Sequence, residues 1–331
     1  MNKRNHFLDF WKFIAAIGVI LVHIQFPGPA GKTLATVGAG GVCLFAVISG
    51  YACFGESNEA SEKILRRLKR NALITIASIA FYIIFSYFLM KSIGQYQQWI
   101  LGFSNPRSYV RMLALGDFEF FYGAVLWYMV ALVYCYIIFY FLIRYDRKKY
   151  IYILLPITVL LRIAVGIYVS STGASWHLRD NFLIGVFPLM CIGYVLADQK
   201  EKVEKLTLPF LMTGTIVSAA AMFLTASINI AGLDISQPFI MLFTVFLFTL
   251  GIRRPGWYVI KPLSYLGQKD SIFIYLFHVI VILILRNIIN SMPLTVDQIR
   301  LLLPVISIIG SILFARLLSL ILSLFKEKKH T

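Results

Sequence analysis

Long apolar stretches follow one another along almost the whole chain, and most of them are long enough to cross a lipid bilayer. A helix needs about 20 apolar residues to span the hydrocarbon core, and a spanning segment must satisfy its own backbone hydrogen bonds. The chain of 331 residues is 59% hydrophobic and 14% charged, which excludes an ordinary soluble globule. Hydropathy predicts ten spans, at residues 7–26, 34–54, 72–90, 122–143, 150–170, 181–198, 207–228, 237–252, 271–290 and 299–324. We therefore predict an all-α, polytopic membrane protein with about ten transmembrane helices in one bundle.

The positive charge of the chain predicts its orientation. The formal net charge is +16, and most of the 31 lysines and arginines fall in short segments on the same side of the predicted spans as the N-terminus. Such clustering marks the cytoplasmic side. We expect both termini to be cytoplasmic, in a multi-pass protein of the plasma (inner) membrane of a bacterium. Membrane lipids are then the partners of these cations, and nucleic acid is not.

No polar stretch is long enough to form a soluble module, so residues 1–331 are predicted to form a single transmembrane domain. The four cysteines, Cys43, Cys53, Cys135 and Cys191, all lie in apolar stretches, where isolated thiols pack as small apolar side chains. Patterns typical of metal or nucleotide sites are absent from the sequence. We expect no metal site and no tightly bound cofactor.

The first apolar stretch carries three ionisable residues, Asp9, Lys12 and His23. Each costs roughly 2.5 kcal/mol or more inside a spanning helix unless it faces a partner or a wet cavity. At 100° per residue all three project from one side of the helix, and Lys12 and His23 are about 16 Å apart along it. We expect this polar stripe to face the interior of the bundle, with Asp9 paired to Lys12 or orienting a residue of another helix.

Four stretches carry a resemblance to a known family. They are LDFWKFIAAIGVILVH (8–23), GVCLFAVISGY (41–51), LWYMVALVYCY (126–136) and LGQKDSIFIYLFHVIVI (266–282). In this order they resemble the integral-membrane acyltransferase type 3 family, whose first span has a basic residue, ten further residues and then His. Lys12 and His23 match that spacing, although the family usually has Arg at the first position. A lysine keeps the charge but lacks the planar fork of arginine.

The resemblance implies a ten-helix enzyme that transfers an acyl group, commonly acetyl, from cytoplasmic acyl-CoA to a hydroxyl of a cell-envelope glycan or related acceptor. Such a transfer needs a base for the proton of the acceptor and a cation or donor for the developing oxyanion. His23 is then the general base or the residue that positions the acyl group, and Asp9 and Lys12 belong to the same catalytic group. Acetyl-CoA, or another acyl-CoA, is expected as co-substrate.

Arginines that follow the second span are candidates for binding CoA. Arg66, Arg67 and Arg70 lie on the predicted cytoplasmic side. They either follow the positive-inside rule and contact anionic lipid, or form a clamp for the phosphates of CoA. The resemblance favours the clamp for one or two of them.

Five further residues are expected to line the site: Ser49, Trp127, Ser271, Tyr275 and His278. Each has an ordinary structural explanation as well. Trp127 suits a packed bundle equally well, and a hydrogen bond between helices explains His278 at least as well as chemistry does. Arg162 lies deep inside a predicted span and is expected to face a polar interior.

Two other functions remain open at this stage. One is a transporter or flippase of a glycan precursor or amino acid, as in the membrane module of serine-racemase-type resistance proteins. The other is a structural partner in envelope assembly. For the enzyme, His23 lies toward the outer end of its span while acyl-CoA is cytoplasmic. Either the pantetheine arm reaches deep into the bundle or the acyl group is relayed.

Overall fold

A computed structural model of the chain describes residues 4–228, 235–290, 292–293 and 295–327, and within these residues all regular structure is helical. Eight helices are long and apolar enough to cross a membrane. Two shorter apolar helices, Phe182–Asp198 and Gln237–Arg253, coincide with the sixth and eighth predicted spans. The all-α prediction is therefore confirmed for the described residues, and the eight candidate spans support a multi-pass membrane protein. The count of ten spans and the cytoplasmic termini stay predictions.

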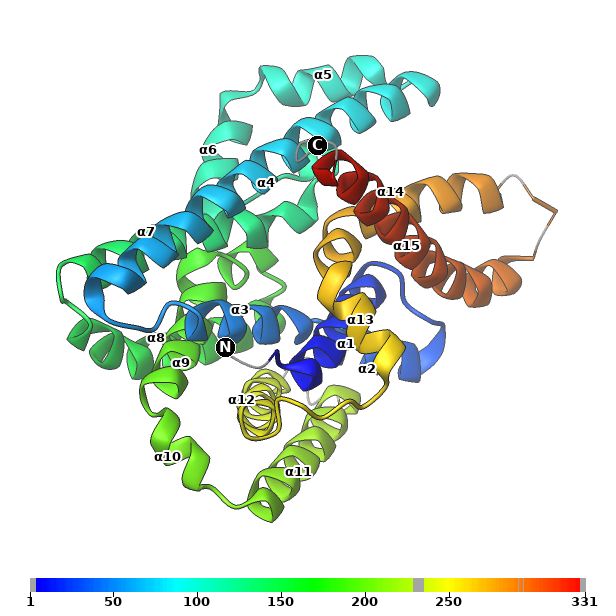
Figure 1. Cartoon of the computed structure of the whole chain (residues 1–331). Helices are drawn as coiled ribbons and strands as arrows, with labels where there is room; N and C mark the ends of the chain where they lie inside the picture. The colour runs from blue at the N-terminus through cyan, green and yellow to red at the C-terminus, as the bar shows by residue number, and fades with distance from the viewer. Residues whose placement is uncertain (1–3, 229–234, 291, 294, 328–331) are drawn as a thin grey trace. The chain divides into compact units, whose positions relative to one another are not determined.

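The helices, labelled in Figure 1, belong to two compact units. The first unit contains the described residues of 1–45, 201–230 and 235–331, and the second contains those of 46–200. The helices of the first unit are α1 (His6–His23), α2 (Gly28–Gly38), α11 (Leu208–Ser227), α12 (Gln237–Arg253), α13 (Lys261–Lys269), α14 (Ser271–Asn290) and α15 (Val296–Glu327). Helix α3 (Gly41–Tyr51) begins in the first unit and continues into the second, and α10 (Lys200–Lys205) links the second unit back to the first.

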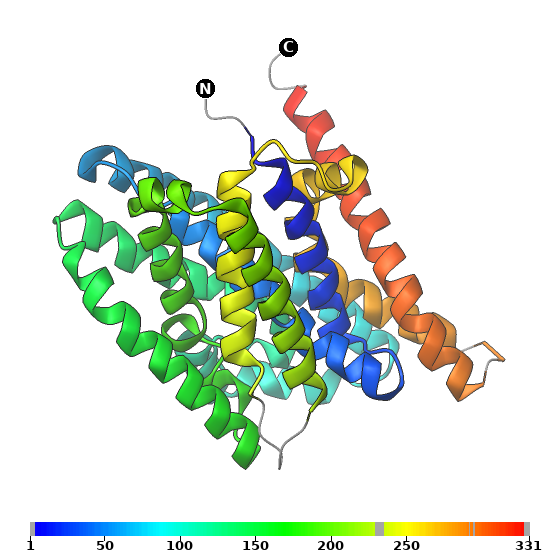
Figure 2. The ribbon, with the colours of Figure 1, turned by 90° about the horizontal axis from the view of Figure 1, so that it is seen from below.

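Helix α1 is central to the first unit, where it packs against α2, α13, α14 and α15. Asn5 begins it by accepting a hydrogen bond from the backbone N–H of Leu8 at 2.9 Å and by donating to the carbonyl of Gly251 at 2.8 Å. Gly267 of α13 lies against α1 so closely that an added Cβ would overlap the carbonyl oxygen of Asp9. In Figure 2, α11 and α12 lie side by side in the same unit, in agreement with their extensive packing.

An apolar core joins α1, α14 and α15. Phe13, Ala16 and Ile20 of α1 are buried with Ile274 and Ile282 of α14 and with Leu303 and Ala315 of α15. On α1 these three residues lie within about 100° of the Lys12–His23 stripe. The polar stripe therefore borders the packed face of α1.

The second unit is built on α4 (Ser57–Ser92) and α7 (Trp127–Arg144), which pack along each other. Asn71 of α4 donates to the carbonyl of Met129 at 2.9 Å, and Ser86 donates to that of Phe121 at 2.6 Å. Between them the chain forms α5 (Tyr96–Ser104), α6 (Pro106–Leu115) and the 3-10 turns η1 (Glu119–Phe121) and η2 (Ala124–Leu126). Then follow α8 (Lys149–Thr172), the 3-10 turn η3 (Trp176–Leu178), the π-helix η4 (Phe182–Val186) and α9 (Phe187–Asp198).

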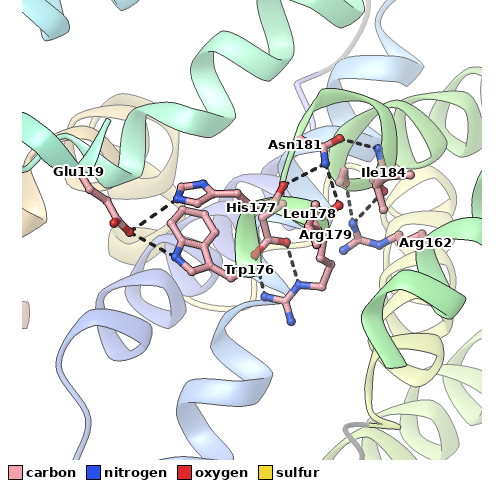
Figure 3. Close-up of polar contacts among 10 residues, drawn as sticks. Glu119, Arg162, Trp176, His177, Leu178, Arg179, Asn181 and Ile184 are labelled. Atoms are coloured by element: carbon pink, nitrogen blue, oxygen red, sulfur yellow. Dashed lines mark hydrogen bonds and ion pairs between the residues drawn. The ribbon is translucent and has the colours of Figure 1, made fainter. Parts of the chain in front are cut away.

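Arg162 of α8 shows how a cation is accommodated inside this unit. Its side chain is buried, and one guanidinium nitrogen donates to the carbonyls of Ile184 and Gly185 at 3.2 and 2.8 Å (Figure 3). Both carbonyls belong to η4, and the wider π-helical turn leaves carbonyl groups available to a neighbouring donor. Arg162 therefore faces a polar environment inside the unit, as expected, and backbone carbonyls provide it.

Candidate active site

The polar stripe of α1 carries a compact ion cluster near its N-terminal end. Asp9 is 3% exposed. One of its carboxylate oxygens lies 2.6 Å from Nζ of Lys12, and the other lies 2.7 Å from Nε of Arg4. The pairing of Asp9 with Lys12 is as predicted from their spacing, whereas the contact with Arg4 was not predicted. An acidic residue in the first turn is also favoured by the helix dipole, so this cluster stabilises the start of α1.

The opposite end of α1 carries a pair of histidines. His23 is the last residue of the helix and is exposed. Its ring lies against that of His278 in α14, with the ring centroids 5.0 Å apart and the planes tilted by 52°. Tyr275, one turn earlier on α14, has its ring centroid 6.3 Å from that of His278. The structure thus brings three of the predicted site residues together.

His278 has a defined hydrogen-bonding state. It is fully buried, and its Nδ1 lies 2.8 Å from the carbonyl oxygen of Tyr275 and 3.2 Å from that of Ile274. Carbonyl oxygens only accept, so Nδ1 carries the hydrogen and Nε2 of the neutral ring offers a lone pair. Among the described residues Nε2 has no hydrogen-bond partner. A buried acceptor of this kind is available to a donor on His23 or on a bound molecule.

The two clusters of α1 are separate. Eleven helical steps, a rise of about 16 Å, separate Lys12 from His23. His23 therefore does not act through direct contact with Lys12 or Asp9, although all three lie on one stripe.

A second buried carboxylate, which the sequence analysis missed, precedes α14. Asp270 is fully buried, and NH1 of Arg316 lies 3.5 Å from one of its oxygens. The guanidinium of Arg316 also lies over the ring of Tyr265, 5.0 Å from its centroid. The neighbouring Ser271, predicted to line the site, donates its hydroxyl to the carbonyl of Gly267 at 2.7 Å. Arg316 lies inside an apolar stretch, where an arginine needs a partner. Its position was the sequence feature from which an acidic partner such as Asp270 could have been predicted.

The cytoplasmic-side arginines differ in their surroundings within the second unit. Arg66 lies 3.9 Å from Glu62, one turn earlier on the exposed face of α4. Arg67 and Arg70 act electrostatically on the hydroxyl of Tyr136, and Ser49 hydrogen-bonds to that hydroxyl. Within the described residues, no carboxylate lies within 4.0 Å of Arg67 or Arg70. These two cations are therefore better placed than Arg66 to receive an anionic ligand.

Trp127 is held by packing. It begins α7, and its ring lies 5.9 Å from that of Tyr128 between centroids. An added Cβ at Gly185 would lie 3.2 Å from the indole of Trp127, and one at Gly116 would lie 3.2 Å from the Cβ of Trp127, so both glycines pack closely against this residue. This contact favours the structural explanation of Trp127.

Comparison with known proteins gives one finding for the whole chain. The acyltransferase type 3 family, described as an acyltransferase domain, matches residues 5–323. No curated protein and no solved structure matches the chain.

We expect the Asp9 cluster to contribute measurably to stability. Asp9→Asn leaves two cations without their common anion, at a cost of about 1–3 kcal/mol in the free energy of unfolding. This cost is below that of a fully buried pair, because Arg4 and Lys12 are partly exposed and can be solvated. Thermal unfolding in detergent should therefore show a lower melting temperature for this variant.

Glu59→Gln, which removes an exposed carboxylate paired with Lys63, is the matched control and should melt like the wild type. Equal melting temperatures for all three proteins would contradict the assignment.

Proposed function

Because this chain belongs to the acyltransferase type 3 family, a family of membrane acyltransferases, we propose that it is an O-acetyltransferase of the plasma membrane. Its donor is cytoplasmic acetyl-CoA, used as co-substrate, and its acceptor is a hydroxyl of a cell-envelope glycan. The observation that carries the proposal is the pairing of an exposed His23 with a buried His278 that has an available lone pair.

The proposed reaction exchanges one acyl bond for another. The acceptor oxygen attacks the thioester carbon, the new C–O bond forms, and the C–S bond breaks with CoA leaving as a thiolate. His23 accepts the acceptor proton as general base and returns it to the thiolate. Histidine suits this role because its unperturbed pKa lies near neutrality.

His278 is assigned as a positioning residue for His23. Its Nδ1–H is committed to backbone carbonyls, so only Nε2 is available toward the neighbouring ring. A hydrogen bond from His23 to Nε2 would leave the other nitrogen of His23 unprotonated and directed at the acceptor. In nucleophile–base arrangements the base is commonly oriented by a third group in this way.

The charged residues away from His23 are assigned to the donor. In the predicted topology the Arg4–Asp9–Lys12 cluster lies at the cytoplasmic end of α1, where acyl-CoA is present. Lys12 keeps part of its side chain exposed while paired with Asp9, and we assign it to contact the donor. Arg67 and Arg70 are assigned to the phosphates of CoA, since arginine forks match phosphate oxygens.

Replacing His23 tests the base directly. His23→Ala should lower acetyl transfer by about 10²- to 10⁴-fold, measured as alkali-labile label from radioactive acetyl-CoA on envelope glycan. His6→Ala is the matched control, because His6 begins the same helix and contacts Tyr258, by stacking with 4.0 Å between centroids and by a hydrogen bond of 2.7 Å between Nε2 and the hydroxyl. His23→Ala with wild-type transfer and intact folding would exclude His23 as the base.

The arginine assignment makes a separate prediction about donor binding. Titration calorimetry should show acetyl-CoA binding about tenfold or more weaker for the double variant Arg67→Ala/Arg70→Ala, because two charge-assisted contacts are lost. Arg66→Ala, which removes a cation already beside Glu62, should bind like the wild type. A larger loss of acetyl-CoA affinity in Arg66→Ala than in the double variant would overturn the assignment. Well-folded wild type that does not bind acetyl-CoA would favour the transporter instead.

A further inference from the structure

Three potential metal ligands meet in the second unit. Asp117 and Glu119 come from the segment between α6 and α7, and His177 comes from η3 between α8 and η4. One ligand atom of each lies within 4.8 Å of the others. Figure 3 shows the His177 ring directed at the carboxylate of Glu119, beside the indole of Trp176.

His177 is the observation that points to a ligand. Its side chain is 2% exposed, and neither ring nitrogen has a hydrogen-bond partner among the described residues. Leaving such buried groups without a hydrogen bond is costly and calls for an explanation. The indole of Trp176 lies against the ring, with 3.7 Å between centroids and the planes tilted by 30°.

The distances within the cluster suit coordination better than direct hydrogen bonding. Nε2 of His177 lies 3.6 Å from an oxygen of Asp117 and 3.7 Å from an oxygen of Glu119. A charged hydrogen bond would be about 2.7–2.9 Å. Ligand atoms placed about 2.1 Å from a tetrahedral zinc ion are about 3.4 Å apart. The two separations from Nε2 of His177 are therefore close to the edges of a coordination tetrahedron.

The surrounding contacts hold the donors in place. Arg111 contacts Oδ2 of Asp117, the oxygen that faces His177, through Nε at 2.7 Å and Nη2 at 2.6 Å. Oδ1 of Asp117 accepts the backbone N–H of Glu119 at 3.1 Å. Asn181 donates to the backbone carbonyl of His177 at 3.0 Å and so fixes the η3 turn. Ligating carboxylates are commonly oriented by such outer contacts. Glu119 is 55% exposed, so it can move by the small distance that coordination requires.

We propose that Asp117, Glu119 and His177 bind a divalent transition-metal ion, Zn²⁺. One imidazole and two carboxylates suit zinc, and three protein ligands leave a fourth position open. The ion would join the α6–α7 segment to the α8–η4 segment. The sequence predicted no metal site, because the ligands come from two distant segments without a spacing motif.

Metal content tests this proposal independently of any enzymatic activity. The full-length protein, purified in detergent through an affinity tag without histidine, is loaded with ZnCl₂ and passed over a desalting column. Zinc per chain is then measured by mass spectrometry. We expect about one zinc ion per chain for the wild type and at least about tenfold weaker binding for Glu119→Gln, since loss of even an outer contact costs this much.

Two controls make the test decisive. Glu59→Gln removes a similarly exposed glutamate elsewhere in the unit and should bind zinc like the wild type. Asp117→Asn, with its folding checked by gel filtration, should behave like Glu119→Gln. Wild type loaded with Co²⁺ should show the visible absorption of a four-coordinate ion, and Glu119→Gln should not. Wild type that holds no more zinc than Glu119→Gln would overturn the proposal, leaving a network of ion pairs.

Discussion

A charged or strongly polar side chain inside an apolar helix must find its partner within the protein, and this requirement organises both units. Asp9 is satisfied by Lys12 and Arg4, and Asp270 lies beside Arg316. One guanidinium nitrogen of Arg162 donates to two carbonyls of a π-helix. The contacts of Asp270 and Arg162 join segments that apolar packing alone would leave free to slide, because lipid and apolar side chains offer similar surroundings. The polar contacts therefore specify which helix faces are turned inward.

The same requirement separates what the sequence could predict from what it could not. Apolar length predicted the helices, and the three-residue spacing predicted the Asp9–Lys12 pair, because both depend only on local geometry. The contact between His23 and His278 depends on how α1 and α14 pack, which local spacing does not determine. Arg66 and Arg67 differ by a rotation of 100° about the helix axis, and only the packing of α4 shows which of them faces Tyr136. The Asp117–Glu119–His177 cluster joins distant segments and had no signal along the chain.

The two ends of α1 carry different groups, and this separation constrains how the proposed enzyme can bring donor and acceptor together. Its cations lie at one end and its exposed histidine at the other, about 16 Å apart. A charged, hydrophilic nucleotide and a hydrophilic glycan therefore need not occupy the same place. Only the acyl group and its linking arm must cover the distance between them. Residues of α1 along this stripe border the apolar core with α14 and α15, so the helix can remain rigid while substrates approach from opposite ends.

The most direct test of this account measures on which side of the membrane donor and product appear. The protein is reconstituted in vesicles with its N-terminus outward, envelope glycan is trapped inside, and radioactive acetyl-CoA is added outside. We predict that radioactive acetyl groups, released by alkali, appear on the trapped glycan, and that none appear when His23 is replaced by alanine. Label confined to glycan added on the outside, or trapped glycan labelled equally by the His23→Ala protein, would contradict it.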